Sequence, residues 1–187
     1  MDRIKAFING SFKTSDGDVL VKINPVNGRP IAEVEKTTDT LLQDAIEAAK
    51  IAQHDWSSLT GQERGQIMAK VSKKLADSLH ELTRLEVKDV GKVWSEAFSS
   101  DVPCGAEAYE FFGSLAATIT GTSHKWTNAR GYAERVLLGI CAGIGAELSY
   151  TDCMLEISAC ASNGKCFYTQ TLGDDALHCK CNSRNCN

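Results

Sequence analysis

The chain has 187 residues, of which 43% are hydrophobic and 24% charged, and its formal net charge is −4 at pH 7. This length suits one domain with a substantial core. The charge balance provides no basic surface for nucleic acid and no polybasic patch for a membrane. The first residues lack the apolar core of a secretory signal, and no run reaches the roughly 20 apolar residues of a membrane span. We therefore expect a cytoplasmic protein.

Short strands joined by turns are predicted for the N-terminal part. Residues 6–8 lead into Asn9-Gly10, which is a strong signal for a hairpin turn. Residues 19–23 alternate apolar and polar side chains, as a half-buried strand does. The cluster of Asn, Pro and Gly at 24–28 predicts a turn, and residues 31–34 predict the next strand.

Helices are predicted to follow these strands. In residues 40–56 apolar side chains recur every three or four positions and therefore share one helical face. A second helix is predicted to begin at Thr60, because Thr60 and Glu63 form a capping box. In this motif the Thr hydroxyl accepts from the amide of the Glu, and the Glu carboxylate reaches back. The apolar pattern continues to Gly91, a residue type that commonly ends helices.

A third helix is predicted over residues 93–119. Pro103 and Gly105 are expected to interrupt it, because proline cannot donate a backbone hydrogen bond. Residues 121–130 are polar and are expected to form a connection.

The C-terminal part has weaker patterns. Residues 136–144 are an apolar run that predicts a buried strand. Beyond residue 146 the periodicity fades, and residues 166–168 predict at most one more short strand. Residues 172–187 show no periodic apolar signal and are expected to be disordered or loosely held.

Several segments, in this order and spacing, resemble the N-terminal part of the aldehyde dehydrogenase family. They are Phe7-Ile8-Asn9-Gly10, Ile23-Asn24-Pro25-Val26-Asn27-Gly28, Ile31-Ala32-Glu33-Val34, Gly61-Gln62-Glu63-Arg64, residues 85–92, residues 109–116 and residues 139–146. The likeness is strong over residues 6–120 and weak beyond 146. Ile23-Asn24-Pro25 and Gly143-Ile144-Gly145-Ala146 resemble the betaine aldehyde and trimethylaminobutyraldehyde branch.

The resemblance implies an α/β fold, namely an incomplete N-terminal part of the aldehyde dehydrogenase fold. It would contain a β-hairpin, long helices and the start of a Rossmann-type NAD domain. Residues 1–146 are then a partial NAD-binding domain, and residues 147–187 a diverged, cysteine-rich tail that is weakly related or unrelated to the family.

The resemblance also implies a reaction. In the family, a Cys thiolate attacks the aldehyde, hydride passes to NAD, and a Glu activates water to release the carboxylic acid. The family places that Cys and that Glu well after position 187, so we expect the 187-residue chain alone to be inactive. An alternative is a non-catalytic product that binds full-length aldehyde dehydrogenase subunits through the hairpin and an arm at residues 132–137.

The cofactor residues that carry over are Ile144, Gly145 and Ala146, in a predicted strand-to-helix turn that could cradle NAD. The turn lacks the third Gly of the dinucleotide fingerprint, and the alternative is a tight turn after a buried strand.

Three positions nearby depart from the family. Leu148 stands at the family Asn that helps to hold the oxyanion, and Ile157 and Thr169 stand at two family Lys residues.

A site for a potassium-type cation is a further expectation from the resemblance. Some betaine aldehyde dehydrogenases hold such an ion through two backbone carbonyls and an Asp side chain, which match Lys22, Ile23 and Asp101. Oxygen ligands suit a hard cation. The alternative is that Asp101 is a surface or capping carboxylate.

The chain has eight cysteines. Cys104 and Cys141 are expected to be small buried hydrophobic residues. The segment His178-Cys179-Lys180-Cys181, with Cys186, has the ligand types of a zinc site but not a standard spacing. The alternatives are a metal- or redox-responsive tail and an unselected tail with no function.

Overall fold

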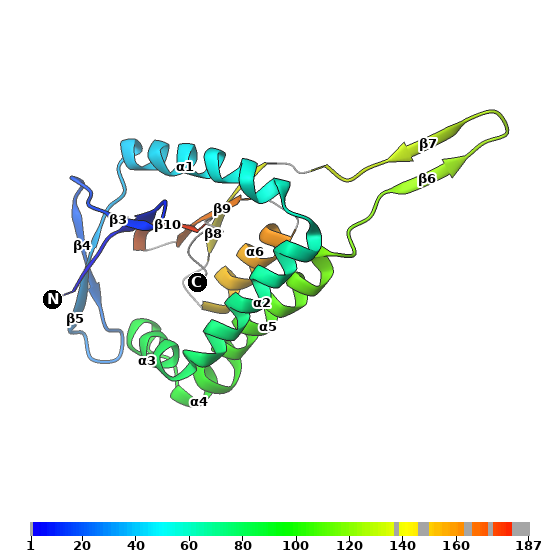
Figure 1. Cartoon of the computed structure of the whole chain (residues 1–187). Coiled ribbons are helices and arrows are strands. Elements are labelled where there is room, and N and C mark those ends of the chain that lie inside the picture. The colour runs from blue at the N-terminus through cyan, green and yellow to red at the C-terminus, as the bar shows by residue number, and fades with distance from the viewer. Residues whose placement is uncertain (1, 137–138, 146–149, 163–165, 172–173, 181–187) are drawn as a thin grey trace.

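In the computed structural model, which describes residues 2–136, 139–145, 150–162, 166–171 and 174–180, helices pack against a mixed β-sheet (Figure 1). The strands are β1 (Asp2–Ile4), β2 (Ala6–Ile8), β3 (Ser11–Lys13), β4 (Val19–Ile23), β5 (Pro30–Glu35), β6 (Thr122–Lys125), β7 (Arg130–Ala133), β8 (Ile140–Gly145), β9 (Cys166–Thr171) and β10 (Asp174–Lys180). The helices are α1 (Asp39–Ser58), α2 (Gly61–Asp77), α3 (Leu79–Val90), α4 (Trp94–Glu96), the π-helix η1 (Ala97–Asp101), α5 (Val102–Ala116) and α6 (Tyr150–Ser162).

The main sheet of the described chain has the strand order β3-β2-β10-β9-β8. Strands β8 and β9 run parallel and are joined by α6, which makes a βαβ unit. Strand β10 is antiparallel to β9 and parallel to β2, so an N-terminal and a C-terminal segment pair within one sheet. A smaller sheet has the order β1-β5-β4, and β6 pairs with β7 in a hairpin that projects from the body (Figure 1).

The predicted N-terminal turns are confirmed. Asn9 and Gly10 both have positive φ angles, of 49° and 75°, which is the backbone pattern of a tight hairpin turn between β2 and β3. Gly28, in the turn between β4 and β5, has a φ of 66°.

The predicted capping box is confirmed as well. The Glu63 amide donates to Thr60 Oγ1 at 3.2 Å, and the Thr60 amide donates to Glu63 Oε2 at 2.7 Å. The expected helix over residues 40–56 is present as α1, where the hydroxyl of Thr38 accepts from the amide of Leu41.

The expected second helix is divided. It breaks at Ser78 into α2 and α3, and α3 ends at Gly91, whose φ of 78° lies in the left-handed region. The third helix is interrupted as expected. The irregular segment is the π-helix η1, which ends just before the α-helix that contains Pro103.

Three expectations for the second half of the chain are wrong. Residues 122–133 form the β6–β7 hairpin, whereas a polar connection was expected at residues 121–130. The buried strand begins at Ile140, and Val136 is 77% exposed. Residues 174–180, expected to be disordered or loosely held, form β10; residues 172–173 and 181–187 lie outside the described part.

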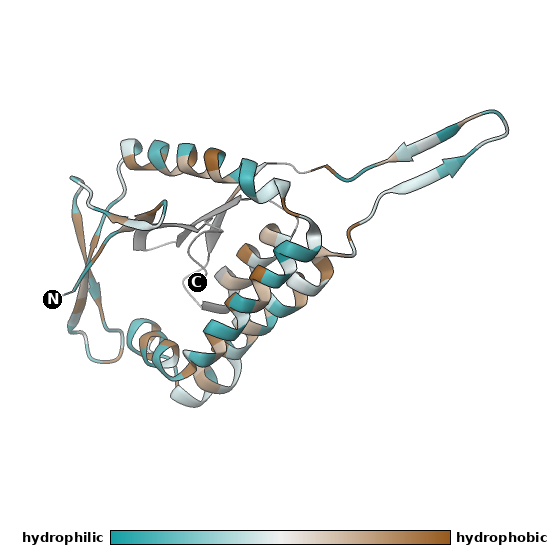
Figure 2. Ribbon diagram, in the orientation of Figure 1, coloured by the Kyte–Doolittle hydropathy of each residue, from teal (hydrophilic) through white to brown (hydrophobic). Residues whose placement is uncertain are grey.

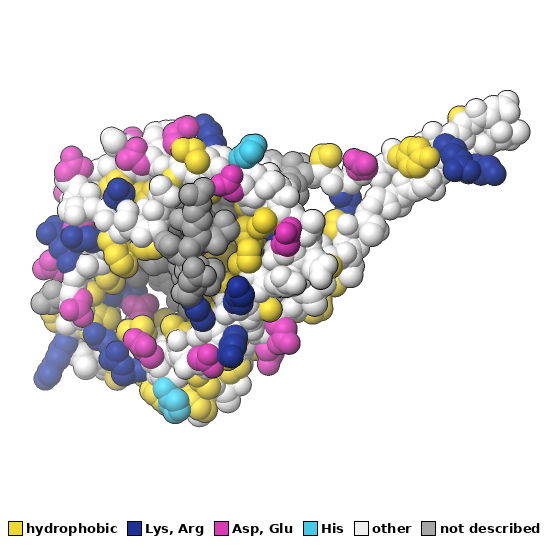
Figure 3. All heavy atoms as spheres, viewed as in Figure 1, with side chains coloured by type: hydrophobic (Ala, Val, Ile, Leu, Met, Phe, Trp, Pro, Cys, Tyr) yellow, Lys and Arg dark blue, Asp and Glu magenta, His cyan; other side chains and the backbone are white. Residues whose placement is uncertain are grey.

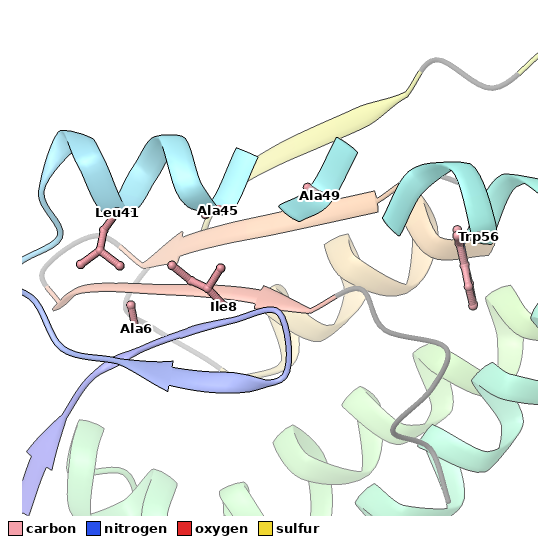
Figure 4. Close-up of a cluster of buried hydrophobic side chains, with 6 residues drawn as sticks. All are labelled: Ala6, Ile8, Leu41, Ala45, Ala49 and Trp56. Atoms are coloured by element: carbon pink, nitrogen blue, oxygen red, sulfur yellow. The ribbon is translucent and has the colours of Figure 1, made fainter. Parts of the chain in front are cut away.

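The core lies on the two faces of the main sheet. Helix α1 covers one face, where Leu41, Ala45 and Ala49 pack with Ala6 and Ile8 of β2 (Figure 4). Hydrophobic and hydrophilic residues alternate along α1 and α2, as amphipathic helices require (Figure 2).

The second core cluster contains Met68, Tyr109 and Ile157, which come from α2, α5 and α6. Charged side chains are scattered over the visible face, and hydrophobic side chains gather over α4 (Figure 3). Within the described residues, no helix is both long and apolar enough to cross a membrane.

Candidate cofactor and cation sites

The βαβ unit supplies the candidate cofactor site. Strand β8 pairs in parallel with β9 from Ile140↔Cys166 to Gly145↔Thr171, and α6 connects them. In such units a ligand lies beyond the carboxyl ends of the strands, and its phosphates face the amide groups at the start of the crossover helix. The connection at residues 146–149 lies outside the described residues, and α6 begins at Tyr150.

Two of the three predicted cofactor residues lie at that end of the unit. Ile144 and Gly145 are the last residues of β8, opposite Gln170 and Thr171 of β9. Both residues were expected to lie in the turn that follows the strand. Instead, strand β8 extends through Gly145. Ala146 lies outside the described residues.

The residues that depart from the family are placed differently. Ile157 is 8% exposed and packs with Met68 and Tyr109, so its side chain belongs to the core of the helical layer. Thr169 lies within β9, paired with Gly143 of β8. Leu148 is outside the described residues.

Two buried side chains hold the C-terminal end of α6. The indole Nε1 of Trp56 donates to the carbonyl of Ala161 at 3.1 Å. Arg64 donates from Nε to the carbonyl of Ser162 at 3.2 Å and from Nη1 to the carbonyl of Leu59 at 2.5 Å. Burial lowers the pKa of the Arg64 guanidinium. Sequence reasoning did not find this role, because the carbonyl on α6 is 98 residues away from Arg64.

The candidate cation site lies where β4 and η1 meet the end of α3. Lys22 Nζ lies 3.4 Å from Asp89 Oδ1 of α3, and Lys92 Nζ lies 2.9 Å from Asp101 Oδ2 of η1. A side chain at Gly91, between these pairs, would meet Pro25 of the β4–β5 turn. These contacts bring Lys22 and Asp101 into one region of the fold.

Two features near Lys22 and Asp101 affect cation binding, namely the irregular backbone of β4 and the lysine that pairs with Asp101. The register of β4 against β5 shifts between Lys22 and Ile23, and Ile23 lies opposite Pro30, which has no N–H to donate. Asp101 is paired with Lys92, whose Nζ also lies 4.0 Å from Glu86 Oε1. Asp101 makes no side-chain hydrogen bond that caps α5.

The described part of the chain holds no group of three or more His, Cys, Asp or Glu side chains that could bind a metal ion. A cation at β4 and η1 would therefore depend on the backbone carbonyls of Lys22 and Ile23. Of the zinc-type residues in the tail, His178 and Cys179 lie in β10, and Cys181 and Cys186 lie outside the described residues.

The two cysteines expected to be buried behave differently. Cys104 is exposed on α5, so that expectation is wrong. Cys141 of β8 is partly buried and packs against the cluster of Met68, Tyr109 and Ile157, which agrees with the role of a small hydrophobic residue.

Residues 12–146 match the aldehyde dehydrogenase family. Betaine aldehyde dehydrogenase 2 of Rhizobium meliloti (strain 1021) is 36% identical over 141 residues, which are 75% of this chain and 29% of the relative. The betaine aldehyde dehydrogenase of Vibrio vulnificus (strain YJ016) is 36% identical over 142 residues, with the same shares. The chain belongs to the aldehyde dehydrogenase family, and it spans about 29% of the length of these relatives.

Solved structures show the same fold. PnpE in complex with nicotinamide adenine dinucleotide aligns with a TM-score of 0.85 and 22% identity, over 91% of this chain and 35% of that chain. The NAD+ complex of an aldehyde dehydrogenase from Bacillus cereus aligns with a TM-score of 0.86 and 22% identity, over 90% and 35%. The predicted fold class, part of the aldehyde dehydrogenase fold, is confirmed.

Proposed function

We propose that this chain serves the NAD-dependent oxidation of a betaine-type aldehyde to its carboxylic acid, as the N-terminal part of the catalytic unit. The observation that supports this most strongly is the 36% identity to a betaine aldehyde dehydrogenase across 75% of the chain. The βαβ unit is consistent with it, because Ile144 and Gly145 lie at the carboxyl end of the parallel β8–β9 pair, the end at which dinucleotides bind in such units.

In this proposal the chain supplies scaffold and part of the cofactor site. Ile144, Gly145 and Ala146 would face the cofactor, and glycine at position 145 would let the cofactor approach the backbone closely. When bound, NAD accepts the hydride that leaves the substrate. Trp56 and Arg64 hold the C-terminal end of α6, and the other end of this helix would face the cofactor.

We further propose that the 187-residue chain has no dehydrogenase activity by itself. The test incubates the purified chain with NAD and betaine aldehyde and follows NADH absorbance, with a full-length betaine aldehyde dehydrogenase as the positive control. We expect no rate above the enzyme-free background. NADH formation that scales with the concentration of the chain would show that the catalytic groups lie within it. A separate titration with NAD, read by protein fluorescence, tests binding independently of turnover.

The proposal extends to a potassium-type cation held by the carbonyls of Lys22 and Ile23 and the carboxylate of Asp101. Because Lys92 already pairs with Asp101, its ammonium would compete with the ion. We expect a higher melting temperature in potassium chloride than in choline chloride at equal ionic strength. Asp101→Asn should remove this difference, and Lys92→Met should enlarge it. Equal melting temperatures in both salts for the unmodified chain and for Lys92→Met would exclude the site.

The alternative function is that of a non-catalytic chain that binds full-length aldehyde dehydrogenase subunits. The observation that favours it is the projecting β6–β7 hairpin and the arm that begins within it at residue 132, where Trp126 is 59% exposed, Tyr132 72% and Val136 77% (Figure 1). Exposed aromatic residues are common at protein interfaces. Co-purification of the tagged chain with a full-length subunit, lost in Tyr132→Ser but kept in the exposed control Ile51→Ser on α1, would support this function.

We also propose that residues 1–146 are the part of the chain related to the family and that residues 147–187 are a diverged tail. Its support is that the family match ends at this residue. In the fold, however, α6 packs against α2 and α5, and β9 and β10 lie between β8 and β2, so the diverged tail takes part in the same sheet. The division is therefore one of sequence relationship and not of folding unit, and limited proteolysis should give no stable fragment that ends near residue 146.

A further inference from the structure

Three aromatic rings meet on the surface where α3 adjoins α4 and η1. The ring centroid of His80 lies 5.0 Å from that of Phe98 and 6.4 Å from that of Trp94. Trp94 and Phe98 are stacked, with their centroids 6.2 Å apart and an angle of 18° between the ring planes. Trp94 is 44% exposed, and hydrophobic side chains gather over α4 (Figure 3). Exposed aromatic clusters of this kind are common at protein interfaces.

Basic side chains lie beside these rings on α3. His80, Arg84 and Lys88 follow one another at intervals of four residues, so they share one side of the helix. Arg84 is exposed and Lys88 half-buried, and one acidic side chain, Glu81, is exposed on the same helix. This side of α3 therefore presents more positive than negative charge. We define the α3–α4 surface by its aromatic and basic members, which are His80, Arg84, Lys88, Trp94 and Phe98.

The outer side of α5 has the opposite character. Glu107 and Glu110 are exposed, Phe111 is 57% exposed and Leu115 38%. Their spacings of three and four residues place these side chains next to one another on the helix. Helix α5 contains no lysine or arginine. We define the α5 surface by these four residues, which combine apolar area with negative charge.

The two surfaces lie apart on one molecule and complement each other. Phe98 of η1 and Phe111 of α5 are separated by roughly 20 Å along one continuous helical run, at a rise of about 1.5 Å per residue. Each surface has exposed aromatic area beside charge of one sign, and the two signs are opposite. The apolar parts of two copies can therefore pack together while the cations of one copy approach the carboxylates of the other.

We propose that the α3–α4 surface of one copy binds the α5 surface of a second copy of this chain. Charge complementarity argues for this occupant, because the same molecule carries both halves of the contact. Contact between two different surfaces is heterologous, and copies that associate in this way form open chains unless the arrangement closes. The affinity should be low, because both surfaces are small and exposed ion pairs contribute little. Such self-association is independent of the proposed dehydrogenase function.

The first test uses the unmodified chain. Sedimentation equilibrium should show a weight-average mass that rises with protein concentration. Association should weaken between about 0.1 M and about 1 M sodium chloride, since the Debye length falls from about 10 Å to about 3 Å. A constant monomer mass up to about 1 mM protein would overturn the proposal, because any weaker affinity is negligible. Association that does not weaken in high salt would overturn it as well.

Chemical crosslinking locates the contact between copies. A carbodiimide joins an amine to a carboxylate that touches it, and an equal mixture of isotopically light and heavy chains distinguishes links between copies from links within one copy. We expect light–heavy links from Lys88 to Glu107 or Glu110. Links between copies that join only other parts of the chain would overturn the proposal in favour of a different interface.

Charge reversal tests whether the two surfaces bind each other. Arg84→Glu and Glu110→Arg should each lower the association constant at least about fivefold, because attraction becomes repulsion. A mixture of the two variants should recover association to within about threefold of the unmodified chain, since each variant keeps the surface that the other has lost. Lys70→Glu makes the same change of charge at an exposed position of α2, outside both surfaces, and should change association less than about twofold.

The aromatic part of the contact is tested separately. Trp94→Ser should lower the association constant at least about tenfold, because aromatic residues at the centre of an interface contribute most to binding. Ile51→Ser, at a position that is 75% exposed on α1, is the control and should have no effect. Circular dichroism checks that the variants keep the fold, and crosslinking of the unmodified chain gives the answer if Trp94→Ser does not. Equal effects of Trp94→Ser and Ile51→Ser would overturn the proposal, as would a mixture of the charge variants that associates no better than either alone.

Discussion

Trp56 and Arg64 donate to adjacent carbonyl groups at the C-terminal end of α6, those of Ala161 at 3.1 Å and Ser162 at 3.2 Å. Trp56 lies near the end of α1 and Arg64 in the first turn of α2, so the junction between these helices is fastened to the crossover helix of the βαβ unit. The last carbonyls of a helix carry partial negative charge, and a guanidinium is a favourable partner for them. A contact between segments about 100 residues apart thus sets the position of the helix that begins beside the candidate cofactor site.

We predict that Trp56 and Arg64 both stabilise the fold, and that Arg64 contributes more because its donor group is charged. Trp56→Phe keeps most of the ring packing but removes one neutral hydrogen bond, which should lower the free energy of unfolding by about 1 kcal/mol. Arg64→Met removes charge-assisted hydrogen bonds and should cost about 2 kcal/mol or more. Urea denaturation followed by circular dichroism measures both. The control Lys70→Met, at an exposed position of α2, should change stability by less than about 0.5 kcal/mol. Equal effects of Arg64→Met and Lys70→Met would contradict the role of Arg64.

Helices α2 and α5 approach closely where glycine faces glycine. A methyl group at Gly65 would lie 2.5 Å from the carbonyl oxygen of Gly113, and one at Gly113 would lie 3.0 Å from Cβ of Met68. Because the atom nearest to a methyl group at Gly65 is a backbone oxygen, one of the two helices would have to move.

We therefore predict that Gly65→Ala destabilises the protein. Alanine is better than glycine in a helix by about 1 kcal/mol, whereas overpacking costs about 1–3 kcal/mol, so the steric effect should prevail. Gln66→Ala, at the neighbouring exposed position, has no such clash and should be neutral within about 0.5 kcal/mol. Thermal melts compare the two variants. A higher melting temperature for Gly65→Ala would show that the helices can separate without cost.

The elements predicted best are those whose signals are local. The helical periodicity of residues 40–56, the capping box at Thr60 and the Asn9-Gly10 turn each depend on side chains a few positions apart, and each is present in the structure. The likeness to the aldehyde dehydrogenases added the βαβ unit, which no local pattern of this sequence requires.

The features that were missed have no local signal. The β6–β7 hairpin is exposed along most of its length, so no burial pattern marks it in the sequence. Strand β10 forms only through pairing with β9 and β2, which are distant or weakly patterned segments. The role of Arg64 depends on Ser162, and the exposure of Cys104 depends on which side of α5 meets α2 and α6. These features are set by tertiary contacts rather than by propensity.

The capping box should give α2 a pH dependence in the acidic range. The backbone hydrogen bond from Thr60, and then its side-chain hydrogen bond, lower the pKa of Glu63 from 4.5. Because the folded-state pKa lies below the unfolded value, the stabilisation is present above the unfolded pKa and is lost as the pH falls through the folded pKa. Glu63→Gln should therefore reduce the fall in melting temperature below pH 4.5. An NMR titration that gives Glu63 a pKa of 4.5 or higher would refute this.

The outer face of α5 should govern the solubility of the chain. Phe111 is 57% exposed and Leu115 38%, and their spacing of four residues places them side by side on the helix surface. Adjacent exposed apolar side chains favour association, so the isolated chain should aggregate as its concentration rises. The double variant Phe111→Ser/Leu115→Ser should remain monomeric at higher concentration in dynamic light scattering, with the free energy of unfolding changed by less than about 1 kcal/mol because little burial is lost.

A matched control separates solubility from stability on the same helix. Phe112 packs against the buried cluster of Met68, Tyr109 and Ile157, so Phe112→Ser removes packed surface instead of exposed surface. It should lower the free energy of unfolding by about 2 kcal/mol or more, and increase aggregation by populating unfolded chains. If the double variant keeps its fold but aggregates as readily as the unmodified chain, Phe111 and Leu115 do not form the surface through which the chains associate. Strand β8 would then be the next surface to change, since it carries no charged residue and, among the described residues, pairs only with β9.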